Sequence, residues 1–195
     1  MLKLPGQSKH LEDESLKDPI KKLTFAGMFL ALCLLLPFLT GQIPQIGMAL
    51  SPMHIPVLLC GFVCGWQYGL TVGFIAPLLR FAIFGMPQPI PMGISMAFEL
   101  AAYGLLAGLL YKYFPKKVLY VYVALILSML GGRLVWGVAM FVFAGIGKSD
   151  FSFQKFLAGA FVTAVPGIIL HIVLIPLVVI AMKQAKLILN DNGKQ

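Results

Sequence analysis

The chain has 195 residues, of which 59% are hydrophobic and only 11% are charged, and its formal net charge at pH 7 is +8. Together with a mean hydropathy of +0.92, this composition excludes an ordinary soluble domain and predicts an all-α membrane protein. The lysines stand just outside the apolar runs and form no basic patch with interleaved aromatic residues, so the positive charge indicates membrane topology and no nucleic-acid partner.

Six apolar segments are expected to cross the bilayer as helices, because a spanning helix needs about 20 mostly apolar residues. Before them, residues 1–22 carry five lysines and four acids without an apolar core, which predicts a cytoplasmic leader and not a signal peptide. Residues 187–195 are predicted to form a cytoplasmic tail. The six spans lie in a transmembrane domain at 23–186 and cover residues 23–39, 53–65, 68–84, 92–113, 118–145 and 156–182. Pro52 and Pro56 predict an irregular outer end for the short second span.

The distribution of lysines predicts that both termini lie inside the cell. Cytoplasmic loops carry the excess of Lys and Arg, whereas the loops at 40–52 and 85–91 contain no charged residue. The lysines before the first span and those after the last span lie on the same side of the membrane only if the number of spans is even. The lysines assigned to the inner side are Lys21, Lys22, Lys112, Lys116, Lys117, Lys183 and Lys186.

Small residues recur four positions apart, a spacing that lets helix backbones approach closely in lipid. We interpret most of these pairs, and the three cysteines, as packing residues, and the cysteines lack the companion ligands of a metal site. Gly27 and Ala31 differ because they follow directly after the leader and could equally face a partner protein. The other pairs are Gly61 and Gly65, Gly69 and Gly73, Gly104 and Gly108, and Ala160 and Ala164.

Apart from Lys112 at the inner end of the fourth span, three charged residues, Arg80, Glu99 and Arg133, lie within the predicted spans. Each costs about 2.5–3.5 kcal/mol to insert, so such residues usually face the bundle interior or a wet cavity. Counting about 1.5 Å per residue places all three, and His54, in the outer or middle part of the bilayer. One acid against two arginines leaves a positive excess, which favours an anionic ligand.

Helical spacing adds neighbours to this cluster, because residues three or four apart share one face. Ser95 and Tyr103 share a face with Glu99, and Trp136 shares one with Arg133. Four helices are therefore expected to contribute to one outward-facing polar and aromatic pocket. Its predicted substrate-binding residues are His54, Arg80, Ser95, Glu99, Tyr103, Arg133 and Trp136.

A structural role remains open for each of these groups. Arg80 can extend to the outer headgroups, Glu99 can form an ion pair with Arg133 or Arg80, and His54 can lie at the interface. His171, in the middle of the sixth predicted span, is interpreted as a neutral packing residue.

The chain contains no metalloprotease or serine-hydrolase motif and lacks the inverted repeat of many secondary transporters. We therefore expect a binder that does not power its own transport, with no catalytic residue and no metal. The alternative class is a membrane-embedded enzyme or an assembly protein. An enzyme would convert its ligand to product, whereas a binder would retain it unchanged.

The segment SPMHIPVLLCGFVCGWQYGLTVGFIAPLLRFAIFGMP, followed by MAFELAAYGLLAGLLY, resembles the substrate-binding S components of energy-coupling factor (ECF) vitamin transporters, in particular a subset found in Firmicutes. The resemblance implies a six-helix S-component bundle in the plasma membrane of a Gram-positive bacterium. It also implies capture of a small vitamin from outside and association with a membrane T component and two cytoplasmic ATPase subunits. These partners would use ATP, and this chain would hold no cofactor.

The first helix of the family typically carries an AxxxA motif that docks on the T component. The corresponding residues are Gly27 and Ala31 in AGMFLA, where the glycine departs from the pattern but keeps the surface small. The family's ligand is covered by the loops at 40–52 and 85–91. Pantothenate is the leading ligand, pyridoxine or hydroxymethylpyrimidine is the nearest alternative, and folate, niacin or riboflavin remain open.

Overall fold

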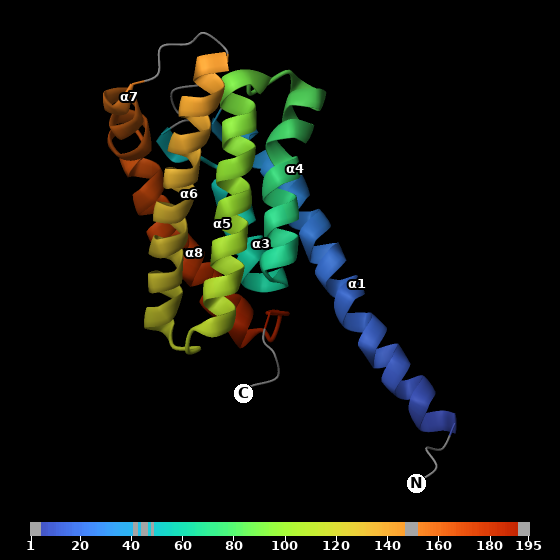
Figure 1. Ribbon diagram of the computed structural model, residues 1–195. Helices are drawn as coiled ribbons and strands as arrows, with labels where there is room; N and C mark the ends of the chain where they lie inside the picture. The colour runs from blue at the N-terminus through green and yellow to red at the C-terminus, as the bar shows by residue number, and fades with distance from the viewer. Residues whose placement is uncertain (1–4, 41–42, 44–46, 48, 147–151, 191–195) are drawn as a thin grey trace.

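The computed structural model describes residues 5–40, 43, 47, 49–146 and 152–190, and every regular element in this part of the chain is helical (Figure 1). Five of the helices are long and apolar enough to cross a membrane. They are α1 (Pro5–Leu35), α4 (Trp66–Phe84), α5 (Ile94–Tyr113), α6 (Val118–Ile146) and α8 (Val165–Gln184).

The predicted second span corresponds to α3 (His54–Cys64), which has only 11 residues. At 1.5 Å per residue α3 is about 16 Å long, whereas the hydrocarbon core of a bilayer is about 30 Å thick. The helix begins late because Ser51 has a left-handed backbone (φ 47°) and Pro52 follows it. Pro56 is accommodated inside α3, since the first turn of a helix does not need its N–H.

Helix α3 lies at the centre of the bundle. All eleven of its residues are buried, and it packs against α1, α4, α5 and α8. The backbones of α3, α4 and α5 meet at glycines: a methyl group added to Gly69 would lie 2.6 Å from the Gly104 carbonyl oxygen and 2.8 Å from the Gly61 Cα. These three glycines therefore hold the helices close together, as small residues do in lipid.

The first helix extends beyond its predicted bounds. Residues 5–22 of the predicted leader continue α1, and Figure 1 shows this N-terminal part projecting away from the bundle. At its other end α1 stops at Leu35 and continues as a 3₁₀ turn, η1 (Leu36–Thr40). Pro37 accounts for this change, because proline has no N–H to donate within a helix and clashes with the preceding turn.

The prediction of a single helix over 156–182, kinked at Pro166, is wrong in its extent. The chain forms a short helix, α7 (Phe153–Leu157), then a π-helical turn, η3 (Ala158–Val162), and begins α8 only at Val165. Pro166 lies in the first turn of α8, and a proline there would obstruct a helix continuing from before it. Residues 147–151 of the preceding loop lie outside the described residues.

After α8 the chain turns back against the bundle. The Leu189 N–H donates to the Val63 carbonyl at 2.9 Å. Asn190 is buried, and its Nδ2 donates to the carbonyls of Gly108 at 3.1 Å and Gly61 at 3.5 Å. Residues 187–190 of the predicted tail are thus bound to α3 and α5, and its last residues, 191–195, lie outside the described part.

Candidate functional site

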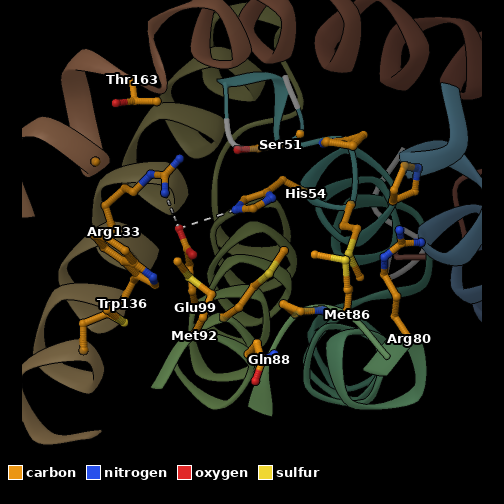
Figure 2. A pocket seen from close by; sticks show the side chains of 18 of the residues that line it. Ser51, His54, Arg80, Met86, Gln88, Met92, Glu99, Arg133, Trp136 and Thr163 are labelled. Carbon is orange, nitrogen blue, oxygen red and sulfur yellow. Dashed lines mark ion pairs between the residues drawn. The ribbon is translucent and has the colours of Figure 1, made fainter. Parts of the chain in front are cut away.

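A cavity of about 620 Å³ lies at the end of the bundle formed by the connection between α4 and α5, opposite the lysine-rich turn that joins α5 to α6 (Figures 1 and 2). Its wall is built from helices α3, α4, α5 and α6 and from the turn at η3 (Ala158–Val162). Residues of η1 and of the segment between η1 and α3 complete it. The volume is in the usual range for a small-molecule site.

Five of the seven predicted substrate-binding residues line this cavity. His54 comes from α3, Arg80 from α4, Glu99 from α5, and Arg133 and Trp136 from α6. The fold therefore brings four helices together around one space, as the spacing of these residues predicted.

The other two predicted residues are buried behind the wall. Tyr103 is 1% exposed and reaches the site only through its hydroxyl group, which contacts Glu99. Ser95 is fully buried, and its Oγ has no hydrogen-bond partner in the described part of the chain. The sequence predicted that Ser95, Glu99 and Tyr103 share one helix face. It did not predict that only Glu99 of these three lines the cavity.

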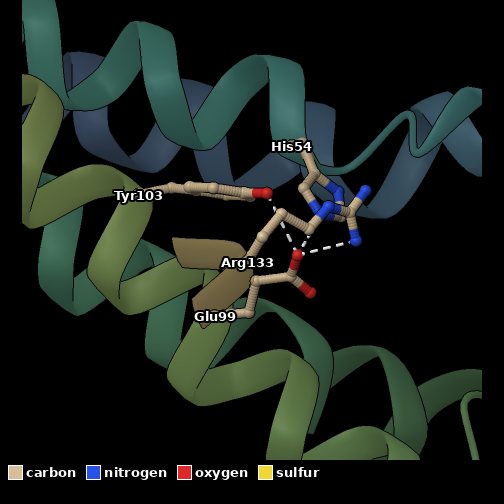
Figure 3. A network of polar contacts seen from close by, with 4 residues as sticks. All are labelled: His54, Glu99, Tyr103 and Arg133. Atoms are coloured by element: carbon tan, nitrogen blue, oxygen red, sulfur yellow. Dashed lines mark hydrogen bonds and ion pairs between the residues drawn. The ribbon is translucent and has the colours of Figure 1, made fainter. Parts of the chain in front are cut away.

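Glu99 is the centre of a buried polar network (Figure 3). Its Oε1 lies 2.9 Å from Arg133 Nη1 and accepts a hydrogen bond of 3.1 Å from the Tyr103 hydroxyl. His54 Nε2 lies 3.5 Å from the same oxygen. The ion-pair partner of Glu99 is therefore Arg133 and not Arg80. The hydrogen bond from Tyr103 helps to offset the cost of burying the two charges.

Arg80 is held in a different way. Its Nη1 donates to the Leu34 carbonyl at 3.0 Å, and its guanidinium carbon lies 5.6 Å from the centre of the Phe38 ring and 5.4 Å from that of Phe84. The residue is only 6% exposed. Arg80 therefore packs within the protein beside the cavity instead of extending outward, and two aromatic faces stabilise its charge.

A second histidine lies behind the cavity wall. The His54 ring stands 6.0 Å from the His171 ring, nearly parallel to it, and 5.1 Å from the Tyr103 ring. His171 is 2% exposed and does not line the cavity. It supports His54 from behind, a position that the sequence interpretation of a packing residue allows.

Much of the cavity wall was not predicted from the sequence. Methionine is the most frequent residue type in its apolar part, and nothing in the spacing of the methionines distinguishes them from ordinary core residues of a membrane protein. Gln88 and Thr163 add polar groups from two connecting segments. The five methionines are Met53, Met86, Met92, Met96 and Met140.

The two predicted covering loops both contribute to the cavity wall where they are described. From the loop at 85–91 come Met86, Pro87 and Gln88, and from that at 40–52 come Ile43, Gly47, Ser51 and Pro52. Residues 41–42, 44–46 and 48 of this second loop lie outside the described residues, so its role as a cover stays a prediction.

The predicted docking pair does not line the cavity and lies on the exposed face of α1. Gly27 and Ala31 are both exposed, and a methyl group added to Gly27 would meet nothing within 4 Å. Ala26, Phe29 and Cys33 face the opposite way, into the core.

Fold and site together define a multi-pass helical membrane protein with a small-molecule pocket between its helices. The chain belongs to the family of ECF transporter, substrate-specific components, whose family model matches residues 21–179. No curated protein and no solved structure matches the chain. Members of this family are the substrate-binding subunits of cell-membrane transporters that associate with an ECF T component and ATPases, and they are not enzymes.

Proposed function

We propose that this S component captures a small, negatively charged vitamin from outside the cell, with pantothenate as the leading ligand. The charge of the pocket wall carries the proposal: Arg80 and Arg133 face a single acid, Glu99, among its described residues. Because a buried charge is costly without a partner, a ligand with one negative charge would complete the site. Pyridoxine and hydroxymethylpyrimidine, the alternatives, carry no net negative charge and would leave the excess uncompensated.

The ligand can be identified directly. We would purify the chain in mild detergent, determine by native mass spectrometry any small molecule that remains bound, and titrate the emptied protein with B vitamins. Stoichiometric retention of a vitamin supports capture and names the substrate. A folded protein that retains none and binds none would refute the proposal, and formation of product would indicate an enzyme.

The Arg133→Ala variant tests whether the pocket is the binding site. We expect at least a tenfold rise in the Kd for the retained vitamin, equal to about 1.4 kcal/mol, in a protein that still elutes as a single species. Lys112→Ala is the matched control, because Lys112 is an exposed cation near the C-terminal end of α5, outside the cavity. An unchanged Kd in folded Arg133→Ala protein would remove Arg133 from the site.

We also propose that the chain delivers its ligand through a T component and two ATPases, which use ATP, while this chain holds no cofactor. The exposed small surface of Gly27 and Ala31 on α1 supports docking there, because a partner helix can approach its backbone closely.

Replacing both docking residues with leucine should block co-purification with the T component and leave the vitamin Kd unchanged. The control is the double variant Ala82→Leu with Ala181→Leu, which enlarges exposed alanines on α4 and α8. Loss of vitamin binding in the first variant would show that the pair packs internally.

We further propose six membrane crossings in the plasma membrane of a Gram-positive bacterium, with both termini in the cytoplasm. The placement of the lysines supports this orientation. A fluorescent protein fused to the C-terminus should fold and fluoresce, and alkaline phosphatase fused there should be inactive. The opposite pattern would contradict an inward C-terminus.

A further inference from the structure

The charged residues of the pocket lie on two separate sides. In Figure 2, Arg80 lies on one side of the cavity, Glu99 and Arg133 lie on the other, and Met86 is placed between them. A ligand that fills the cavity therefore meets a charged side chain at each end, and the wall between them also carries the polar groups of His54 and Gln88.

At the first end, Arg80 has donors that the described residues do not engage. Among these residues its one hydrogen bond is from Nη1 to the Leu34 carbonyl, whereas a guanidinium group has five N–H donors. No carboxylate in the described part of the chain forms an ion pair with Arg80. The rings of Phe38 and Phe84 lie against the guanidinium, so this end offers a positively charged group held by the protein, which can bind an anion with paired hydrogen bonds.

At the second end, one oxygen of Glu99 has no contact among the described residues. Arg133, Tyr103 and His54 all contact Oε1, and none of the described residues contacts Oε2. An ionised carboxylate has about four acceptor positions and no donor. This end therefore suits a hydroxyl or amide N–H group of the ligand, and the negative charge of Glu99 disfavours an anion beside it.

We propose that the pocket selects one class of ligand in one orientation: a monoanion whose charged group binds Arg80, and whose far end donates a hydrogen bond to Glu99 Oε2. This inference rests on the proposed function, since it specifies the ligand of the same pocket. It separates the candidate vitamins by structure, because pyridoxine lacks the anion and nicotinate lacks a donor at the far end from its carboxylate.

Two pairs of compounds test the two ends separately by isothermal titration. Panthenol is pantothenate with its carboxylate replaced by an alcohol, and N-(3,3-dimethylbutanoyl)-β-alanine is pantothenate without its two hydroxyl groups. We expect the wild-type protein to bind pantothenate at least tenfold more tightly than either compound, because each analogue leaves one buried polar group without a partner.

The variants should then divide the two effects. Arg80→Gln should reduce the preference for pantothenate over panthenol to about onefold and preserve the preference over the dideoxy compound, whereas Glu99→Leu, which removes the acceptor, should do the reverse. Lys112→Gln, an exposed cation outside the cavity, should change neither ratio. Comparison of ratios within one variant cancels any general loss of affinity.

Each result has a distinct meaning. If Arg80→Gln leaves the preference over panthenol intact, or if both variants reduce both ratios equally, recognition at two ends is wrong. If the wild type binds pyridoxine and no anion, the anion end is refuted while vitamin capture stands, and if it binds nicotinate as tightly as pantothenate, the donor end is refuted. Binding of no vitamin at all overturns the proposed function itself.

Discussion

Replacing Gly69 with alanine tests whether close contact between helix backbones holds the pocket together. Gly69 lies on α4, and its missing side chain leaves room for the backbones of α3 and α5. The added methyl group would lie 2.6 Å from the Gly104 carbonyl oxygen, whereas ordinary contacts begin at 3.4 Å. The helices would therefore have to separate by about 0.8 Å.

The cost of this separation should be high, because the atoms in the way are backbone atoms that cannot rotate aside. Overpacking in a core typically costs about 1–3 kcal/mol, and we expect Gly69→Ala to lie at the upper end, about 3 kcal/mol. For a chain of this size 1 kcal/mol corresponds to roughly 2–4 °C in Tm, so the loss should be about 6–12 °C. Glu99 lies five residues from Gly104 on α5, so a shift of this helix should also weaken ligand binding.

Thermal unfolding in detergent, followed by the loss of monodisperse protein, measures the effect. The control is Gly27→Ala, the same chemical change at a helical position where the methyl group meets nothing within 4 Å, and its Tm should be equal to or slightly above that of the wild type. A Gly69→Ala protein as stable as the control would show that the helices adjust at little cost, and the argument from close packing would be wrong.

Three further substitutions test single contacts. Tyr103→Phe removes a hydrogen bond to the Glu99 carboxylate, and we expect a loss of about 1.5–3 kcal/mol in unfolding free energy; an unchanged Tm would contradict it. Ser95→Ala removes a buried hydroxyl that has no partner among the described residues, so neither Tm nor vitamin affinity should fall, and a weaker Kd would instead place Ser95 against the ligand. Asn190→Ala and Asn190→Asp both remove the Nδ2 donor to the Gly108 carbonyl, so the alanine variant should lower the unfolding free energy by about 0.5–1.5 kcal/mol, and the aspartate variant by more, because its buried oxygens face two carbonyls. If only the alanine variant is destabilised, packing and not the hydrogen bond is responsible.

Hydropathy and lysine placement were sufficient to locate most of the helices. The predicted third and fifth spans, 68–84 and 118–145, agree with α4 (Trp66–Phe84) and α6 (Val118–Ile146) to within two residues. The extent of the last helix was wrong: 156–182 was predicted as one span kinked at Pro166, whereas α8 begins only at Val165. Window-averaged hydropathy does not respond to a single missing N–H, which explains this error. The predicted second span, 53–65, contains the short α3 (His54–Cys64), and its crossing of the membrane stays a prediction.

The candidate site was predicted in its composition but not in its arrangement. Helical spacing correctly placed Glu99 and Arg133 on inward faces, yet it left open which arginine pairs with the acid. The two phenylalanines around Arg80 and the position of His171 behind His54 had no signal in the sequence, because each contact joins different helices.

By itself, the sequence determined that this is a helical membrane protein of the S-component family with three costly charges inside its spans, since insertion energies and local motifs depend on short stretches of chain. Only the tertiary structure decided that Glu99 pairs with Arg133, that Arg80 stands apart between Phe38 and Phe84, and that Arg80 and Glu99 lie on two sides of one cavity. These distances depend on the rotation and separation of neighbouring helices. The rotation and separation are set by contacts such as those of Gly69 with Gly61 and Gly104, which join residues far apart in the chain.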